Sequence, residues 1–315
     1  MAEKTEFIMF IGLPASGKST LAAKYRSAGY SVFSSDAVRA EIEAAIERGE
    51  FVLPSNNNLN GVVFERIVRE VAEEIKKGNS VVLDATNLTR KRRMNFKRWL
   101  CRYHCLMKCV LFIAPVSVCM ERNANRVGAA RVPDEAMDKM LRSFECPNYW
   151  EGWDEIVPII DETPYAFDFE KTIGFSQETP HHSLTLYEHM AKAKEYVKEH
   201  GGNEMLQRVA MYHDIGKFHV KKFENRKGEP SEFAHFYEHE NYGAYLYLTE
   251  KCCGKTLTKE EFDEVLYETC LINCHMRPLH FWKPDGKARE KDKRLFGERF
   301  FTDLVALNAA DRAAH

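Results

Sequence analysis

Apolar residues in the first half of the chain fall into short runs, separated by longer amphipathic segments. The runs occupy residues 7–12, 31–35, 81–84 and 109–115, a helical pattern follows over 62–77, and another helix is expected from Val116. Short apolar runs bounded by turn residues are typical of buried strands, and their alternation with helices is typical of a parallel sheet covered on both faces. The first half therefore predicts an α/β fold with a mostly parallel sheet.

The pattern changes between residues 155 and 180. Pro158, Pro164 and Pro180 interrupt any long element there, and the sequence beyond reads as helix after helix with no convincing strand. Proline clusters of this kind are typical of a domain boundary. We therefore predict an α/β domain over residues 1–165 and an all-α domain over residues 166–315.

Composition agrees with two domains and narrows the class of protein. The chain has 315 residues, 44% hydrophobic and 29% charged, with a net charge of −2. It exceeds the length that one core usually serves, and it has no overall basic charge for gripping nucleic acid. No apolar run is long enough to span a bilayer, and the opening residues are too polar for a signal peptide. We expect a cytoplasmic protein without a membrane partner.

One stretch departs from this charge balance. Arg90 to Arg93, with Lys97, Arg98 and Arg102, form a basic segment on a predicted helix. Such a segment is commonly a solvated helix face, and alone it is weak evidence for a polyanionic substrate.

A phosphate-binding signature directly follows the first predicted strand. Residues 12–19 fit G-x-x-x-x-G-K-[ST]. Glycines let the loop curl so that backbone N–H groups face phosphates, and the next helix adds its positive N-terminal end. Lys18 would reach the β- and γ-phosphates, and the Ser19 hydroxyl would bind Mg²⁺. The predicted ATP-binding residues are Gly12, Leu13, Pro14, Ala15, Ser16, Gly17, Lys18, Ser19 and Thr20.

The acceptor site has to be sought at the ends of later strands. Asp36 follows the second strand, and Arg39 lies one helical turn further on. A carboxylate there could take the proton of an attacking hydroxyl, and an arginine beside it could hold an acceptor phosphate. Asp36 is equally suited to capping the helix that follows, with Arg39 as an exposed charge. The residues alone leave both interpretations open.

Two further segments suit phosphoryl transfer. The third strand ends at Asp84, followed by Asn87, which would place a carboxylate near Mg²⁺; a simple turn is the alternative. Arg122 and Arg126 stand one turn apart on a helix that leads into a glycine-containing segment. They could close over the phosphates as a lid, or they could be solvated helix charges.

These segments together resemble a known family. In order and spacing, GLPASGKST, SSDAVR, LDATNLTRKRR and ERNANR…RVP are similar to the 5′-hydroxyl polynucleotide kinases of phage and bacterial RNA repair. The resemblance implies that Asp36 is the general base, that Arg39, Asp84 and Asn87 serve substrate binding, and that Arg122 and Arg126 stabilise the transferring group. Ala85 is a departure, because the phage enzyme has its aspartate at that position.

The second half carries histidines and aspartates on apolar helical stripes. His213 and Asp214 follow Leu206 and Ala210 on one such stripe, and Gly216 suits the C-terminal end of that helix. The same pattern recurs around His189, His239, His275 and Asp311. Burying such groups unpaired is costly, and a bound metal removes the cost. A single histidine of this kind is more often an ordinary core residue, but five helices that share the pattern favour a metal site.

The order H…HD…H…H…D resembles the HD phosphohydrolase superfamily. That resemblance implies one metal on His189, His213, Asp214 and Asp311, and a second on His239 and His275 with Asp214 bridging. Such a pair would activate water at a phosphate ester, with Asp214 and Lys217 in catalytic roles. Lys217 is alternatively a helix-end charge. Mn, Fe, Co, Ni and Zn all suit these ligands.

Together, the two halves resemble bacterial end-healing fusions with the domain order reversed. They predict phosphorylation of 5′-OH nucleic-acid ends, with RNA favoured, removal of a 2′,3′-cyclic or terminal phosphate, and a separate RNA ligase as partner. One alternative is a nucleoside or metabolite kinase fused to a nucleotide phosphohydrolase. Another is an ATP-regulated nucleic-acid-binding module with a structural metal.

Overall fold

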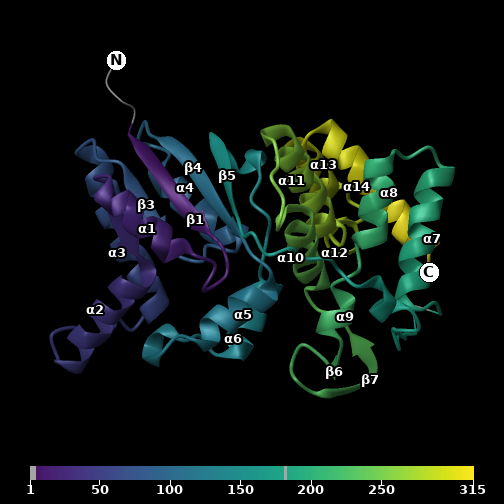
Figure 1. The fold of residues 1–315 in the computed structure, drawn as a ribbon, viewed down its shortest axis with the longest axis horizontal. Coiled ribbons are helices and arrows are strands. Elements are labelled where there is room, and N and C mark those ends of the chain that lie inside the picture. The colour runs from purple at the N-terminus through teal and green to yellow at the C-terminus, as the bar shows by residue number, and fades with distance from the viewer. Residues whose placement is uncertain (1–4, 181–182) are drawn as a thin grey trace. The chain divides into compact units, whose positions relative to one another are not determined.

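The computed structural model describes residues 5–180 and 183–315, which form two compact units (Figure 1). The first unit runs from the N-terminus to Val132 and includes Glu151–Ile159, and the second contains Pro133–Trp150 and Ile160–His315. The chain therefore passes between the units more than once, and the segment Pro133–Trp150 packs with the second unit. A single boundary at residue 165, as predicted from the prolines, does not describe this exchange.

The first unit is built on a five-stranded sheet. Its strands are β1 (Glu6–Ile11), β2 (Ser31–Ser34), β3 (Val81–Asp84), β4 (Leu106–Ile113) and β5 (Glu155–Ile160), in the spatial order β2-β3-β1-β4-β5. The strand β1 pairs in parallel with β3 and β4, and β2 pairs in parallel with β3. The predicted parallel α/β fold is confirmed for this half of the chain.

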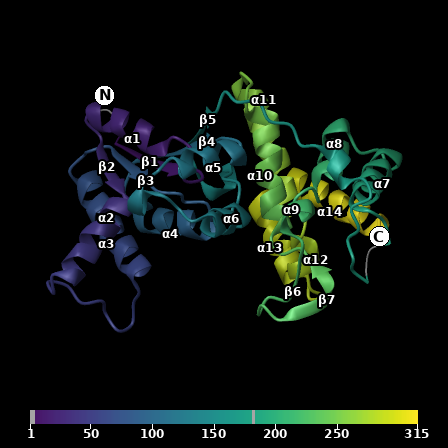
Figure 2. The same cartoon turned by 60° about the horizontal axis from the view of Figure 1, so that its bottom comes forward.

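Helices cover both faces of this sheet. They are α1 (Lys18–Ser27), α2 (Ser35–Glu47), α3 (Leu59–Lys76), α4 (Arg90–Leu100) and α5 (Val116–Ala124), followed by the 3₁₀ turn η1 (Gly128–Ala130). Ile8 and Phe10 of β1 pack with Ala22 of α1, and α1 and α4 lie on opposite sides of the strands (Figure 2). Alternation of side chains along a buried strand supplies apolar groups to both layers.

Polar caps start three of these helices. Ser34, Asn58 and Thr89 accept hydrogen bonds from the backbone N–H groups of Ala37, Gly61 and Arg92, which begin α2, α3 and α4. A cap of this kind satisfies one of the unpaired N–H groups in the first turn. Because Ser34 ends β2 and Thr89 follows β3, the two helices start at the carboxyl edge of the sheet, where parallel α/β folds bind ligands.

The second unit is mainly helical. It contains α6 (Asp134–Arg142), α7 (Leu186–Glu199), α8 (Glu204–Tyr212), α9 (Lys217–Val220), α10 (His239–Cys252), α11 (Lys259–Cys274), α12 (Arg277–Phe281), α13 (Lys287–Phe296) and α14 (Glu298–Ala313), with the 3₁₀ turn η3 (Phe169–Thr172). Another 3₁₀ turn, η2 (Tyr149–Glu151), lies where the chain returns to the first unit. Capping boxes at Thr185 and Thr258 begin α7 and α11.

One element departs from the all-α prediction. An antiparallel hairpin, β6 (Lys222–Glu224) and β7 (Pro230–His235), follows α9 and projects from the helices (Figures 1 and 2). The Asn225 side chain accepts hydrogen bonds from the N–H groups of Lys227 and Glu229, which closes the turn. The strands are short and mostly exposed, so they lack the apolar run that would reveal a strand in the sequence.

Among the helices of residues 5–180 and 183–315, none is long and apolar enough to cross a membrane.

Candidate functional sites

The phosphate loop connects β1 to α1. Gly17 is the N-cap residue of α1 and has a φ of 97°, a conformation that favours glycine. Gly12 is needed for a different reason, because a Cβ there would lie 2.8 Å from Cβ of Phe112 and 2.9 Å from Oγ of Ser16. These two glycines let the loop fold back on itself above the strand ends.

Lys18 lies inside this loop. Its Nζ donates to the carbonyl oxygens of Leu13, at 2.6 Å, and Gly12, at 3.1 Å, and the residue is 8% exposed. Burial lowers the pKa of Lys18 to about 8, although the Asp84 carboxylate raises it. The loop therefore holds the cation that the sequence predicts for the β- and γ-phosphates.

Ser19 and Asp84 meet beside Lys18. The Ser19 hydroxyl donates a hydrogen bond to the carboxylate of Asp84, which ends β3. Burial raises the pKa of Asp84, and the nearby Lys18 lowers it. A hydroxyl and a carboxylate are the hard oxygen ligands that Mg²⁺ prefers, so this pair fits a magnesium ion bound with ATP.

Asp36 does not cap α2, because Ser34 fills that position. Asp36 lies in the first turn of α2 with an exposed side chain, and the N-cap interpretation of this residue is therefore wrong. Its charge raises the pKa of both Lys18 and Asp84 by Coulomb interaction, after the larger effect of burial on each. Asp36 lies at the carboxyl edge of the parallel strands, the same edge from which the phosphate loop extends.

Arg39 and Arg92 accompany Asp36. Arg39 donates to Oδ1 of Asn60 at 2.7 Å. Burial lowers the pKa of Arg92, the charge of Arg39 lowers it further, and the charge of Asp36 raises it. Two arginines and a carboxylate therefore share this edge of the sheet. The sequence patterns did not separate Arg92 from the rest of the basic segment.

Asn87 is fully buried and holds this edge together. It has a φ of 44°, its Nδ2 donates to the Phe10 carbonyl at 2.8 Å, and its Oδ1 accepts from Nε of Arg92 at 3.1 Å. In this structure Asn87 positions Arg92, and a direct contact of Asn87 with substrate stays a prediction.

The basic segment is only partly solvated. Arg93 is fully buried, and its guanidinium forms a bidentate pair with Glu151 at 2.6 and 2.8 Å. Lys97 is also buried, donates to the Gly152 carbonyl and lies 4.2 Å from the Trp153 ring centroid. These two cations hold the segment Glu151–Ile159 in the first unit, which corrects the view of the whole segment as a solvated face.

The two lid arginines lie on either side of a helix end. Arg122 is on α5, whereas Arg126 lies beyond its end at Ala124, so they are not one turn apart on one helix as predicted. Nη1 of Arg126 donates to the Ala130 carbonyl at 3.3 Å, and its charge lowers the pKa of Lys18 after burial. Asn123, unnoticed in the sequence, is fully buried and bonds both the N–H and the carbonyl of Val132.

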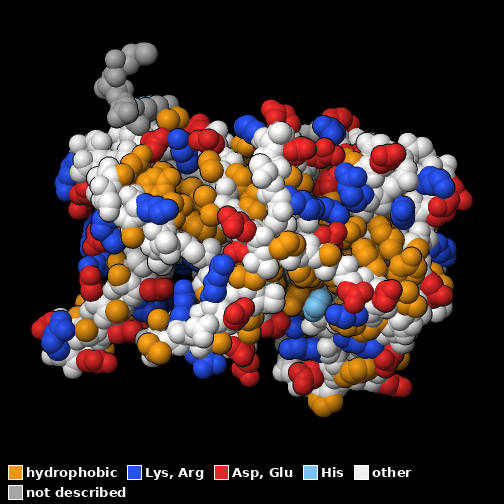
Figure 3. Space-filling model, in the orientation of Figure 1, with side chains coloured by type: hydrophobic (Ala, Val, Ile, Leu, Met, Phe, Trp, Pro, Cys, Tyr) orange, Lys and Arg blue, Asp and Glu red, His pale blue; other side chains and the backbone are white. Residues whose placement is uncertain are grey.

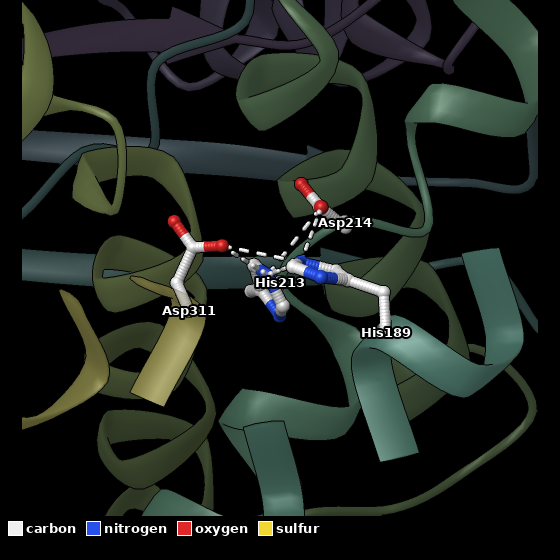
Figure 4. Close-up of side chains that lie close together, drawn as sticks. All are labelled: His189, His213, Asp214 and Asp311. Carbon is white, nitrogen blue, oxygen red and sulfur yellow. Dashed lines mark hydrogen bonds and ion pairs between the residues drawn. The ribbon is translucent and has the colours of Figure 1, made fainter. Parts of the chain in front are cut away.

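The second unit gathers the six predicted metal ligands. His189 of α7, His213 and Asp214 after α8, and Asp311 of α14 point toward one another (Figure 4). His213 and Asp214 lie in the turn that follows α8 rather than on its stripe, since the helix ends at Tyr212. Asp214 also joins a second group with His239, at the start of α10, and His275, after α11.

Asp214 is shared by the two groups through its separate oxygens. Its Oδ2 lies 3.2 Å from Nε2 of His189 and 3.4 Å from Nε2 of His213. Its Oδ1 lies 3.0 Å from Nε2 of His239 and 3.4 Å from Nε2 of His275. A carboxylate in this position is suited to bridge two cations.

The imidazoles are oriented by backbone carbonyls. Nδ1 of His213, His239 and His275 each lies 2.7 Å from a carbonyl three residues earlier. A carbonyl can only accept, so each Nδ1 carries a hydrogen, and each Nε2 is directed into the cluster, where it can hold a proton or bind a metal ion. Nε2 atoms then face each other at 3.2 Å between His189 and His213, and at 3.1 Å between His239 and His275.

Imidazole nitrogens and carboxylates that face one another in a buried cluster are stable only if the cluster also holds positive charge. Burial would lower the pKa of His213, yet Asp214 and Asp311 raise it to about 10. Burial would raise the pKa of Asp214, yet Lys217 and the imidazoles hold it well below its usual value. Protons supply this charge here, and divalent cations bound at the same nitrogens would displace them, so the donor set fits metal ions.

Lys217 and Gly216 complete the turn. Nζ of Lys217 lies 2.6 Å from Oδ2 of Asp214 and 3.0 Å from Oε1 of Gln177, so Lys217 is more than a helix-end charge. Gly216 has an ordinary helical φ of −63°, and a Cβ there would lie 2.0 Å from the His239 carbonyl oxygen. Glycine is therefore needed here because the turn lies close to α10, and not because it ends a helix as predicted.

Comparison with known proteins gave a family match within the first half of the chain. Residues 7–147 match a family described as an AAA domain, AAA_33. The comparison with curated proteins gave no match. The matched residues contain the phosphate loop and most of the parallel sheet, so the match agrees with a nucleotide-binding P-loop fold in the first half of the chain.

Solved structures similar to the chain include several kinases. A sugar kinase from Janibacter sp. HTCC2649 is 19% identical, with 49% of this chain and 84% of that chain covered and a TM-score of 0.38. A gluconokinase from Sinorhizobium meliloti 1021 is 21% identical, with 50% and 83% covered and a TM-score of 0.36. A chain of the Pnkp1/Rnl/Hen1 RNA repair complex is 18% identical, with 44% of each chain covered and a TM-score of 0.36.

Proposed function

We propose that the chain heals broken nucleic-acid ends with two separate sites. The first unit would transfer the γ-phosphate of ATP to a 5′-hydroxyl, with RNA favoured over DNA. The second would hydrolyse a 2′,3′-cyclic or terminal phosphate, and a separate RNA ligase would seal the break. Both parts of this proposal rest on the side chains of each site rather than on the fold, since one fold serves many reactions.

The observation that carries the kinase proposal is the position of Asp36. A carboxylate that does not cap its own helix, at the edge of the sheet that also carries Lys18 and the two arginines, is suited to act as a general base. Arg39 and Arg92 would hold the acceptor phosphate, which a polynucleotide has and a free nucleoside lacks. A free nucleoside would offer these two cations no anionic group.

The transfer step follows from these residues. The acceptor oxygen attacks the γ-phosphorus, its proton passes to Asp36, and the bond from γ-phosphorus to the β–γ bridging oxygen breaks to release ADP. Lys18, Arg122 and Arg126 would stabilise charge on the phosphoryl oxygens during transfer. Mg²⁺ held by Ser19 and Asp84 would neutralise the β- and γ-phosphates.

The observation that carries the hydrolase proposal is Asp214, whose two oxygens face two histidine pairs. Divalent Mn, Fe, Co, Ni or Zn bound there would activate water and polarise a phosphate ester. His189, His213 and Asp311 would hold one ion, and His239 and His275 the other. The Lys217 ammonium lies against Asp214, where it can turn toward a phosphate oxygen.

A pair of substitutions in the full chain tests the proposal. Asp36→Ala should abolish transfer to a 5′-OH oligoribonucleotide and spare hydrolysis of a 2′,3′-cyclic phosphate end. Asp214→Ala should do the reverse. If each variant stays folded and loses both activities, the model of two independent sites is wrong. If the wild type binds nucleic acid but shows neither activity at any divalent metal tested, the alternative of a nucleic-acid-binding module is favoured.

A further inference from the structure

A long segment beside the phosphate loop lacks acidic residues. From Ala85 to Met120 the sequence has no Asp or Glu, yet it holds eight basic residues: Arg90, Lys91, Arg92, Arg93, Lys97, Arg98, Arg102 and Lys108. Elsewhere the surface mixes both signs, as the face in Figure 3 shows. Arg93 and Lys97 are buried, which leaves Lys91, Arg98 and Arg102 exposed along or just beyond α4, with Arg92 half-buried. A polyanion would meet its most favourable field along this helix.

One stripe of α4 leads away from the acceptor site. Arg92, Asn95 and Trp99 are spaced so that they follow one side of the helix, and Arg102 lies in the turn just beyond its end. Arg92, in the first turn, lies near Asp36 and Arg39. Helix α3 also begins near the acceptor site, because Asn60 in its first turn accepts from Arg39. The two helices therefore share a starting point, and α4 carries Trp99 two turns further on.

Later turns of α3 and α4 enclose a groove of about 280 Å³. Its residues are Phe64, Glu65, Val68, Arg69, Ala72, Glu73, Lys76, Trp99, Arg102 and Tyr103. Phe64, Val68 and Ala72 supply apolar surface, while Trp99 is 51% exposed. The groove therefore offers an apolar floor and an accessible indole face to a flat apolar group.

Each aromatic ring at the end of this groove has a cation beside it. The Arg102 guanidinium lies 5.8 Å from the Trp99 ring centroid, and Nζ of Lys76 lies 5.8 Å from the Tyr103 ring centroid. Three cations and the two acids Glu65 and Glu73 line the groove. Rings flanked by cations are suited to stack a nucleobase while the cations hold its phosphates. A protein partner would find the same apolar groove but would not need the acid-free stripe that leads to it.

We propose that this groove binds a base of the acceptor strand, the third or fourth nucleotide from the 5′ end, by stacking on Trp99. Trp99 lies seven positions after Arg92 on the helix, which corresponds to a rise of about 10 Å. A stacked strand rises about 3.4 Å per nucleotide, so the groove lies about three nucleotides beyond the acceptor phosphate. This subsite rests on the proposed kinase function, and it predicts that kcat/KM depends on the length of the acceptor.

Phosphorylation of oligoribonucleotides of increasing length tests the subsite. The full chain is assayed with labelled ATP, Mg²⁺ and 5′-OH acceptors of two, four and eight nucleotides. For the wild type, kcat/KM should rise by about 5- to 150-fold between two and four nucleotides, the range expected for one stacked base, and then level off. Trp99→Ala should lose this rise through KM and keep the activity on the dinucleotide, and Trp99→Phe should keep part of the rise.

A binding readout separates stacking from a loss of stability. Quenching of tryptophan fluorescence by the tetranucleotide should be seen in the wild type and be reduced in Trp99→Phe. Because Trp99 is half exposed, Trp99→Ala should stay folded and bind ATP normally. Arg102→Gln with Lys76→Gln provides a second test, and this double variant should show a smaller effect of acceptor length and a weaker dependence on salt.

Two outcomes would overturn the subsite, for different reasons. Equal losses on the dinucleotide and the octanucleotide in Trp99→Ala, or no length effect in the wild type, would reject the subsite and leave the groove to a protein partner. An absence of phosphorylation on every oligonucleotide, with a nucleoside phosphorylated instead, would reject the proposed function and the subsite with it.

Discussion

Capping of α2 and the proposed proton acceptance belong to two different residues, Ser34 and Asp36. Ser34 caps α2, and Asp36, two residues later in the first turn, is exposed and does not cap the helix. Asp36→Asn should therefore lower kcat by about 10²- to 10⁴-fold, the usual contribution of a general base, with little change in the melting temperature. Steady-state kinase assays and thermal melts of the same preparations measure both effects.

Ser34→Ala is the matched control for this residue. Loss of the cap should lower the free energy of unfolding by about 1 kcal/mol, while kcat stays close to the wild-type value at a temperature where the variant is folded. If Ser34→Ala reduced kcat as much as Asp36→Asn in a fully folded sample, the assignment of the base to Asp36 would be wrong.

At the scale of elements, the turn between α8 and α9 depends on contact with α10. Gly216→Ala would place a methyl group 2.0 Å from the His239 carbonyl oxygen, so the backbone has to move. We expect a loss of at least about 1–3 kcal/mol in the free energy of unfolding, as for other overpacked sites, and weaker metal binding because His239 starts α10. Denaturant melts and titration with Mn²⁺ or Zn²⁺ measure the two effects.

Gly243→Ala tests the same contact from the opposite helix. A Cβ there would lie 3.1 Å from the Gly216 nitrogen, a contact that a small shift relieves. This variant should lose less stability than Gly216→Ala and should keep its metal affinity. Equal behaviour of the two variants would mean that close approach at Gly216 does not hold the two ligand-bearing elements together.

Sequence patterns predicted the elements that carry strong periodicity or a motif. The strand runs, the phosphate loop and the residues that the structure gathers around Asp214 could all be found in this way. The hairpin β6–β7 could not, because its strands are short and exposed. The burial of Arg93 could not either, since its partner Glu151 is 58 residues away and only the fold brings the two together. Pairing across such a distance leaves no local signal.

At the scale of the whole molecule, the segment Pro133–Trp150 completes the helical unit. The Asn241 side chain donates to the Arg142 carbonyl at 2.8 Å, the Cys146 N–H donates to Asn273 at 2.6 Å, and the buried Phe144 ring packs on Tyr245. A fragment of residues 133–315 should therefore melt at a higher temperature than one of residues 166–315, which exposes this surface to water. Equal melting temperatures would show that the boundary at residue 165 is sufficient after all.

The central claim is that the first unit phosphorylates nucleic-acid ends. The most direct test is to incubate the full chain with γ-labelled ATP, Mg²⁺ and a 5′-OH oligoribonucleotide, with a free nucleoside in a parallel reaction. Label is expected on the oligoribonucleotide alone, because Arg39 and Arg92 require an acceptor phosphate. Label on the nucleoside alone, or on neither acceptor, would contradict the claim.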